Sequence, residues 1–373
     1  MSNYSQDITF IRTNQVALGD PRLAKQVKAL VDYGYNVTIL AWDRELEQKP
    51  LEILEGALVK NFRLKAPYGK LRIVFYYPIF WIWVLLNTLL MRPYVIHACN
   101  LDAGVIGYFC RKINLCRKFV FDIFDGFALS FIPHDKKVLF RLVHTIEDHL
   151  FYEADIGIIP SEERAKFYKR YGRKNVIVIL NSPPDVVAGF KKISGNRRFT
   201  VVYAGIIGPS RGILELAKAT SDLEVDLILA GRVINTYMFS KCNKYEHVKY
   251  TGLLSYMDAL NLENIADCIV ALYEPSTITR RLAEPSKVYE AIMLGKPLVT
   301  NVKRGVVEGY RCGITVSYGD IDELRSAIKF LKENPNVASE MGLNGRKAYE
   351  DCFNWSKQCE KLINAYRCLL NGA

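Results

Sequence analysis

The chain has 373 residues, which exceeds the size of one small core and predicts two domains of ordinary size. Half of the residues are hydrophobic and the formal net charge is +11, so we expect a globular protein with an anionic partner. Lysine and arginine are scattered and do not form a stripe with aromatic residues, which argues against nucleic-acid binding. The nine cysteines lack a Cys-x-x-Cys pair and the first residues lack an apolar run, so we expect reduced thiols, no signal peptide and a cytoplasmic location.

The first half of the chain predicts alternating strands and helices. A strand is expected at 8–13, and the loop through Gly19 leads to a helix that Asp20 caps and Pro21 opens. A second buried strand follows at 37–42, but the unit has no Gly-x-Gly-x-x-Gly motif, so dinucleotide binding is poorly supported. Further β-type runs, separated by helical segments, occur at 95–98, 119–122, 156–159 and 176–180. This alternation predicts a parallel sheet with helices on both faces.

A polar segment at 194–198 is the best linker candidate, and a second alternation of strands and helices begins after it. Its β-type runs occur at 199–205, 225–230, 248–251, 268–272, 298–300 and 314–316. We therefore predict two doubly wound α/β domains, residues 1–193 and 194–354, followed by a helix at 355–373. In such domains ligands bind outside the carboxyl ends of the strands.

The segment 73–91 is unusually apolar and aromatic, with Arg72 before it and Arg92 after it. A membrane-spanning helix needs about 20 apolar residues, and Pro78 and Asn87 leave a shorter apolar core here. A helix that joins two strands of one sheet also cannot leave that sheet's side of a membrane. Two alternatives remain, a buried core helix and a helix that dips into a bilayer surface, and the basic flanks favour the surface. The side chains expected to contact the membrane are Phe80, Trp81 and Trp83.

The turn after the strand at 199–205 contains closely spaced glycines. Gly205 and Gly208 let the backbone approach a ligand closely, and Arg211 lies where the strand gives way to a helix. Its guanidinium group is a fork-shaped donor that suits phosphate oxygens. The alternative is a glycine-rich turn that carries a solvated arginine.

A second candidate segment, 284–300, predicts a helix opened by Pro285, a stop at Gly295 and a short strand. Lys287 precedes Glu290 by three residues, so both lie on nearly the same side of the first turns. A cation and a carboxylate beside a helix N-terminus suit a phosphorylated ligand that carries hydroxyl groups. The alternative is an ordinary solvated ion pair at a helix start.

One motif imitates a metal site. The sequence Asp320-Ile321-Asp322 has the form of a metal-binding Asp-x-Asp motif. Asp320 and Glu323, however, have the spacing of a capping box that opens the next helix, and this is the role we predict. No metal site is predicted elsewhere in the chain.

These segments, in this order, resemble the retaining glycosyltransferases of family 4, which have the GT-B fold of two Rossmann-like domains that face each other across a cleft. The resemblance covers nearly the whole chain and includes the segments 19–22, 95–98, 203–212 and 285–297, together with the final helix. It implies an N-terminal acceptor-binding domain and a C-terminal domain that binds a nucleotide sugar. In such proteins the final helix packs back on the N-terminal domain.

The resemblance also implies roles for single residues. Glu290 matches the second glutamate of the family's Glu-x7-Glu motif, which holds the ribose hydroxyls, whereas Leu282 stands at the position of the first. Arg211 matches one phosphate-binding cation, and Ile206 replaces the other. The donor-binding set implied in this way comprises Gly19, Gly205, Gly208, Arg211, Ser286, Lys287 and Glu290.

The catalytic residues that the resemblance implies are Asp125, Arg211 and Lys287. Many relatives carry a histidine where this chain has Phe124, so Asp125 is left as the nearest polar group to the reacting sugar. Cations and helix amides around the diphosphate would stabilise the charge that develops when the sugar–phosphate bond breaks. The departing phosphate would then help to deprotonate the acceptor, without a metal.

The implied function is transfer of a sugar, with retention, from a UDP- or GDP-sugar to a lipid-linked or cell-envelope glycan acceptor. The nucleotide sugar is a co-substrate, no cofactor is expected, and the enzyme would lie peripherally on the inner face of the cytoplasmic membrane. Two alternatives stay open. One is a nucleotide-sugar 2-epimerase of the same fold, and the other is a non-catalytic subunit that binds a nucleotide sugar.

Overall fold

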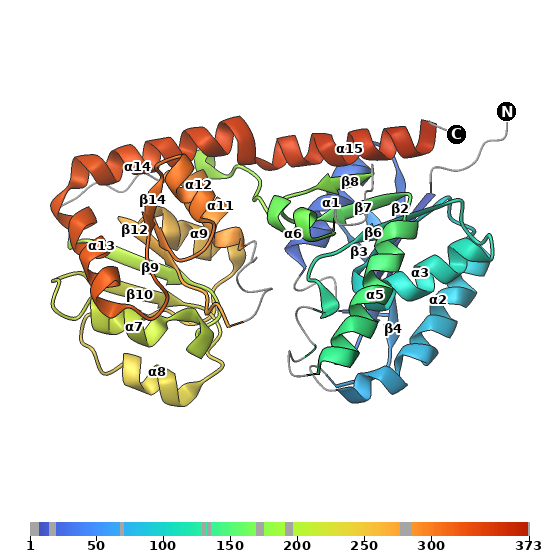
Figure 1. The fold of residues 1–373 in the computed structure, drawn as a ribbon, viewed down its shortest axis with the longest axis horizontal. Helices are drawn as coiled ribbons and strands as arrows, with labels where there is room; N and C mark the ends of the chain where they lie inside the picture. Colours follow the sequence, from blue (N-terminus) through green and yellow to red (C-terminus); the bar gives the residue numbers. More distant parts are fainter. Residues whose placement is uncertain are drawn as a thin grey trace. The chain divides into compact units, whose positions relative to one another are not determined.

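The computed structural model describes residues 7–14, 20–67, 71–128, 132, 136–168, 175–190, 197–276 and 285–371. Gly19 and Leu282 lie outside these ranges. The chain divides into two compact units (Figure 1). The first unit comprises Met1–Leu180 and Gln358–Ala373, and the second unit comprises Asn181–Lys357.

The division between the units differs from the predicted boundary at 193/194. The chain after Leu180 belongs to the second unit, where the Tyr349 hydroxyl donates to the Pro183 carbonyl at 2.8 Å. The chain returns to the first unit at Gln358, whose side-chain oxygen accepts from the Leu180 amide at 3.2 Å. Because these bonds join residues far apart in the sequence, the polar composition at 194–198 could not reveal them.

A sheet of eight strands forms the centre of the first unit, in the order β3-β4-β2-β1-β5-β6-β7-β8. The strands are β1 (Asp7–Arg12), β2 (Asn36–Asp43), β3 (Leu51–Leu54), β4 (Ala57–Arg63), β5 (Val95–Cys99), β6 (Lys118–Asp122), β7 (Ile156–Ile159) and β8 (Val176–Val178). Neighbouring strands are parallel except β3 and β4, which form a hairpin absent from the predicted elements. Its turn at Glu55 and Gly56 has positive φ angles of 48° and 84°, as a type I′ turn requires.

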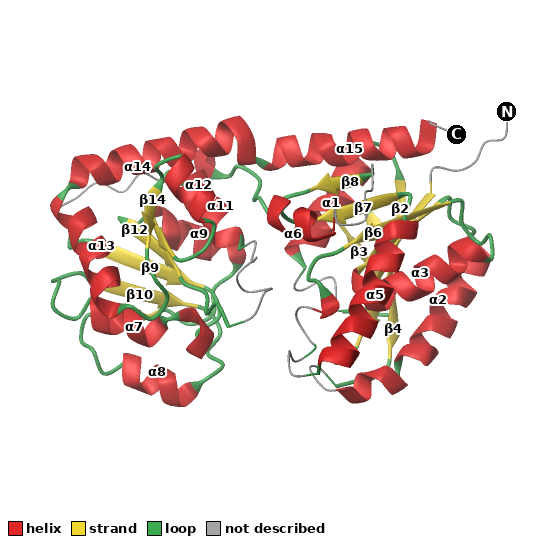
Figure 2. Ribbon diagram, in the orientation of Figure 1, coloured by secondary structure: helices red, strands yellow, loops and turns green. Residues whose placement is uncertain are grey.

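Helices cover both faces of this sheet (Figure 2). They are α1 (Pro21–Asp32), α2 (Tyr77–Met91), α3 (Asn100–Lys112), α5 (Lys137–Glu153), α6 (Glu162–Tyr168) and α15 (Trp355–Asn371), with a 3-10 turn at Leu71–Phe75. The start of α1 is as predicted, because the Asp20 side chain accepts from the Leu23 amide at 3.2 Å. In one layer α3 packs between α2 and α5. The described helices include none with both the length and the apolar character needed to cross a membrane.

The inner face of α2 corrects the predicted membrane contacts. Phe80 is fully buried and stacks on Trp42 of β2, with ring centroids 5.2 Å apart. Trp81 is half-buried and donates its indole N–H to the Asp102 carbonyl at 2.9 Å. Trp83 is also half-buried and packs against Phe80. The prediction that Phe80 contacts a membrane is therefore wrong, whereas Trp81 and Trp83 are only partly buried against the core.

The second unit has a parallel sheet of six strands in the order β11-β10-β9-β12-β13-β14. The strands are β9 (Thr200–Ala204), β10 (Asp226–Ala230), β11 (Val248–Tyr250), β12 (Cys268–Ala271), β13 (Leu298–Thr300) and β14 (Gly313–Thr315). The helices are α7 (Ile213–Ala219), α8 (Thr236–Cys242), α9 (Tyr256–Asn264), α11 (Ser286–Met293), α12 (Arg304–Gly309), α13 (Ile321–Glu333) and α14 (Pro335–Ala348), with short turns at Val187–Gly189, Pro209–Arg211 and Tyr349–Phe353. Every strand predicted in this half of the chain is present.

Asp320 caps α13 as predicted, since its side chain accepts from the amides of Asp322 and Glu323. Glu323, however, accepts from the Ser317 amide at 2.7 Å, so the reciprocal half of the capping box is not formed. Within the described ranges no group of three or more His, Cys, Asp or Glu side chains is arranged to hold a metal ion.

Candidate functional site

Two glycine turns meet at the carboxyl ends of β9 and β10 in the second unit. The Gly205 amide donates to the Ala230 carbonyl at 2.9 Å, and both Gly205 and Gly231 have positive φ. A Cβ atom added to Gly231 would lie 1.8 Å from the Gly205 carbonyl oxygen. Only glycine therefore permits these two turns to lie against each other.

Beside these turns lies a cavity of about 320 Å³. Its wall is formed by the ends of β9 and β10, by the residues before α9, and by Tyr256 and Lys287. The carboxyl edge of a parallel sheet is where α/β proteins bind ligands, so the position of the cavity favours a binding role. Gly205 and Ile206 line it, whereas Gly208 opens the turn at Pro209–Arg211.

A buried ionic cluster stands next to this cavity. The Lys287 Nζ lies 2.7 Å from Glu290 Oε2 and 2.8 Å from Glu263 Oε1. Glu263 is fully buried and Glu290 is 2% exposed, so the alternative of a solvated ion pair is wrong. Burial raises the pKa of the Tyr256 phenol, and the charges of Glu290 and Glu263 add to this, so Tyr256 lies within electrostatic range of the same cluster.

Glu263 was not among the predicted site residues. It follows the buried Leu260 by three positions on α9, so the helical spacing placed its carboxylate on the inward face. Burial raises the pKa of Glu263 to about 7, and the neighbouring Glu290 adds to this, while Lys287 opposes it. Burial alone would lower the pKa of Lys287, but the two carboxylates outweigh it and raise that pKa. Lys287 therefore stays charged, and the carboxylates of Glu263 and Glu290 already balance its charge.

Arg211 differs from Lys287 in having no ion pair within the described part of the chain. Its guanidinium group lies 4.3 Å above the ring of Tyr273, which follows β12. Burial raises the pKa of Tyr273 to about 12, and the charges of Arg211 and Lys287 oppose that rise, so both cations lie within electrostatic range of this phenol. Arg211 is thus a cation near this cavity that no described carboxylate neutralises, so it can pair with an anionic ligand.

The start of α11 differs slightly from the prediction. Pro285 is the N-cap residue, with extended backbone angles, and Ser286 is the first helical residue and is exposed. The following turn carries Lys287 and Glu290 inward, because Val288 and Tyr289 are buried with them against the sheet.

In the first unit the predicted Asp125 lies on the loop after β6. The Asn100 side-chain oxygen accepts from the amides of Phe124 and Asp125 at 2.8 and 3.2 Å, which fixes the loop. Arg164 donates to the Phe124 carbonyl at 2.8 Å, and its Nη2 lies 3.8 Å from Asp125 Oδ1. The Asp125 side chain is 62% exposed, so it is held in place and accessible to a ligand.

Two arginines flank the ring of Phe124, with guanidinium carbons 4.6 Å (Arg12) and 5.0 Å (Arg22) from its centroid. Arg12 pairs with Asp20 at 2.8 Å, and Arg22 pairs with the fully buried Asp122 at 3.0 Å. The charge on Arg22 and the bonds from neighbouring side chains lower the pKa of Asp122 to about 2, although burial acts in the opposite direction. Arg12, at the carboxyl end of β1, was not predicted.

Behind this loop His97 ties the last helix to the sheet. Its Nδ1 lies 2.7 Å from the Tyr366 hydroxyl of α15, and its Nε2 lies 3.5 Å from Asp122 Oδ2. Burial lowers the pKa of His97. This histidine, which carries part of the family resemblance, is a structural group of the core, and the segment from Gln358 onward packs on the first unit.

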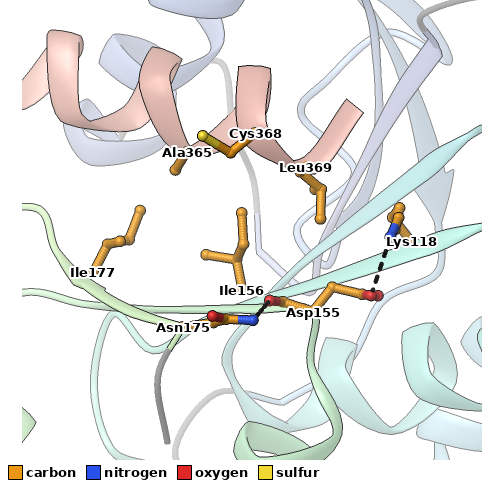
Figure 3. Close-up of a pocket in the computed structure, with 8 residues that line it drawn as sticks. All are labelled: Lys118, Asp155, Ile156, Asn175, Ile177, Ala365, Cys368 and Leu369. Carbon is orange, nitrogen blue, oxygen red and sulfur yellow. Dashed lines mark hydrogen bonds and ion pairs between the residues drawn. The ribbon is translucent and has the colours of Figure 1, made fainter. Parts of the chain in front are cut away.

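Another hollow, of about 420 Å³, lies under α15 (Figure 3). Figure 3 shows Asp155 between Lys118, at 3.6 Å, and the Asn175 side chain, which donates to the Asp155 carbonyl at 3.1 Å. These residues stand at the amino ends of β6, β7 and β8. The hollow is therefore at the edge of the sheet opposite to Asp125, and its position does not favour a ligand site.

The two sheets, with their strand orders and helical layers, define the GT-B fold, which confirms the predicted fold class. The structure is similar to sucrose-phosphate synthase from Thermosynechococcus elongatus, with a TM-score of 0.81 and 17% identity over 99% of this chain and 100% of that one. It is also similar to Anabaena HepE in complex with UDP-glucose, with a TM-score of 0.71 and 17% identity over 96% of this chain and 98% of that one.

A third similar structure is the apo form of the lipopolysaccharide outer core galactosyltransferase WaaB, with a TM-score of 0.64 and 13% identity over 96% of this chain and 99% of that one. No protein-family model matches the sequence, and no curated protein matches it significantly. At these identities the likeness establishes the fold, and the activity has to be argued from the residues of the site.

Proposed function

We propose that the protein is a glycosyltransferase that uses a nucleotide sugar as donor. The observation that carries this proposal is the buried Glu290, fixed by Lys287 beside a cavity at the carboxyl ends of β9 and β10. A carboxylate held in this way can accept hydrogen bonds from both hydroxyls of a ribose. The fold of HepE, which binds UDP-glucose, supports the same assignment.

In the second unit we assign the diphosphate to Arg211, whose charge no carboxylate among the described residues neutralises. When the sugar–phosphate bond breaks, negative charge grows on the departing diphosphate, and a cation placed there lowers the barrier. The Gly205 and Gly208 turn would let backbone amides approach the same phosphates. Lys287 becomes a positioning residue that orients Glu290, which replaces its predicted role as a free cation at the diphosphate.

In the first unit we assign the acceptor to the loop of Asp125. Asn100 and Arg164 hold this carboxylate in a fixed, exposed position, where it can accept a hydrogen bond from an acceptor hydroxyl. The proposed acceptor is a lipid-linked or cell-envelope glycan at the inner face of the cytoplasmic membrane. The proposed reaction retains the anomeric configuration, with the leaving phosphate taking the acceptor proton, and it uses no metal and no cofactor besides the UDP- or GDP-sugar.

Calorimetric titration of UDP, GDP and their sugars into the full chain tests the donor site. We expect Arg211→Ala and Glu290→Gln each to weaken binding of the best nucleotide by about tenfold or more, because each removes charge-assisted hydrogen bonds. Glu340→Gln, an exposed substitution on α14, is the control. If both site variants bind the nucleotide as the wild type does, the proposal is wrong. Donor turnover without an acceptor would favour the epimerase alternative.

A further inference from the structure

The outer face of α2 and of the turn before it is apolar and uncovered in the first unit. Phe75 is 79% exposed and Leu90 is 83% exposed, which is unusual for side chains of this size. Between them Ile79, Ile82 and Leu86 are each more than half exposed. The spacing of three, four and four residues places Ile79, Ile82, Leu86 and Leu90 on one side of the helix, and Phe75 ends the 3-10 turn before it.

The buried residues of α2 follow the same spacing on the opposite side. Phe80, Val84 and Thr88 recur every four residues and are fully buried. The helix is therefore anchored to the core by one side, and its exposed apolar side is not a result of loose packing. We name the outer set Phe75, Ile79, Ile82, Leu86 and Leu90 the α2 face.

The charged residues that flank α2 in the sequence on either side are positive. The fifteen residues of α2 include no charged side chain. The exposed Arg72 precedes the helix, and the exposed Arg92 follows it directly. A hollow of about 560 Å³ at the start of the face is lined by Pro67, Arg72, Phe75, Tyr76 and Ile79. A single cation among apolar groups complements a ligand with an anionic head and an apolar chain.

The neighbouring α5 repeats this arrangement on the other side of α3 (Figures 1 and 2). Val138, Leu142 and Ile146 recur every four residues and are exposed. Exposed cations accompany them at the start of the helix, at Lys136, Lys137 and Arg141. One layer of the first unit therefore presents two apolar helix faces, each with cations at its start.

We propose that this layer docks the protein on an anionic bilayer, with α2 lying along the membrane surface and the α2 face inserted among the acyl chains. The fifteen residues of α2 extend roughly 22 Å, which is less than the roughly 30 Å of a hydrocarbon core, so the helix lies in the interface. Basic groups beside the face would meet lipid phosphates. A second copy of the chain fits less well, because it would bring arginines against arginines.

This inference deepens the proposed membrane location and relates it to the acceptor. Crossover helices run antiparallel to the strands they join, so α2 and α5 both begin at the carboxyl edge of the sheet, where the Asp125 loop also lies. A bilayer that contacts these helix starts would present lipid-linked molecules along that same edge of the first unit.

Co-sedimentation of the full chain with phosphatidylcholine vesicles, with and without phosphatidylglycerol, tests the proposal. We expect binding to the anionic vesicles and at least a tenfold loss of binding in the triple variant Phe75→Ser/Ile82→Ser/Leu90→Ser. The matched control is Leu51→Ser/Ile53→Ser on β3 of the same unit, which also replaces exposed apolar side chains and is expected to bind as the wild type does. If the triple variant is less stable to heat than the wild type, the double variant Arg72→Gln/Arg92→Gln tests the docking surface in its place. This double variant is expected to lose the preference for anionic lipid.

Three results would overturn the docking surface: a wild type that does not bind anionic vesicles, a triple variant that binds them normally, or a wild-type dimer that the triple variant abolishes. Nucleotide binding, measured in parallel, keeps the two proposals apart. Vesicle binding without nucleotide binding would refute only the transferase, whereas nucleotide binding without vesicle binding would refute only the docking surface.

Discussion

The buried cluster of Glu263, Lys287 and Glu290 predicts a specific pH dependence of stability. The pKa of Glu263 is raised from 4.5 to about 7 in the folded chain, chiefly by burial. Between these two pH values the folded chain keeps the Glu263 proton, whereas the unfolded chain releases it. The free energy of unfolding therefore falls as the pH rises through this window and changes no further above about pH 7.

The size of this effect follows from the two pKa values. Each pH unit between them is worth about 1.4 kcal/mol, so the full window from 4.5 to about 7 corresponds to about 3 kcal/mol. In Glu263→Gln the side chain keeps an oxygen that can accept from Lys287 but no longer titrates. The wild type should therefore lose about 3 kcal/mol relative to this variant between pH 4.5 and pH 7.

Urea unfolding followed by far-UV circular dichroism at several pH values from 4.5 to 8 measures this difference. Glu340→Gln in the same unit controls for the loss of one exposed carboxylate and should follow the wild type at every pH. The reasoning would be refuted if the free energies of unfolding of the wild type and Glu263→Gln differed by the same amount at every pH. It would also be refuted if the wild type gained stability relative to the variant as the pH rises.

Two further predictions concern packing. Gly231→Ala should lower the free energy of unfolding by roughly 3 kcal/mol and abolish nucleotide binding, because its Cβ would lie 1.8 Å from the Gly205 carbonyl oxygen. Urea unfolding measures the change in stability, and an unchanged free energy of unfolding would contradict the described turn. Phe80→Ala should lower the free energy of unfolding by about 3 to 5 kcal/mol, because Phe80 is fully buried. The adjacent Ile79→Ala should change it by about 0.5 kcal/mol or less, because Ile79 is exposed. Equal effects of the two substitutions would mean that the faces of α2 are assigned wrongly.

Features that depend on neighbours in the chain were predictable from the sequence. Asp20 caps α1 and Asp320 caps α13, because a side chain reaches amides two or three residues away. The alternation of apolar runs with helical segments likewise predicted the two sheets, which are parallel apart from β3, and, through the resemblance, the GT-B fold. The Glu55-Gly56 turn also had a local signal, a glycine between alternating apolar residues, but the β3–β4 hairpin was missed.

The sequence by itself determined the kinds of elements, their order, and that Glu290 and Arg211 follow strands of one sheet. Only the tertiary structure decided which side of each element is buried, because burial depends on partners that are distant along the chain. In α2 nearly every side chain is apolar, so the sequence offered no polar side to mark the outer face, and Phe80 was misplaced. In the same way, the partnership of Lys287 with Glu263 exists only because α9 and α11 meet in the folded second unit.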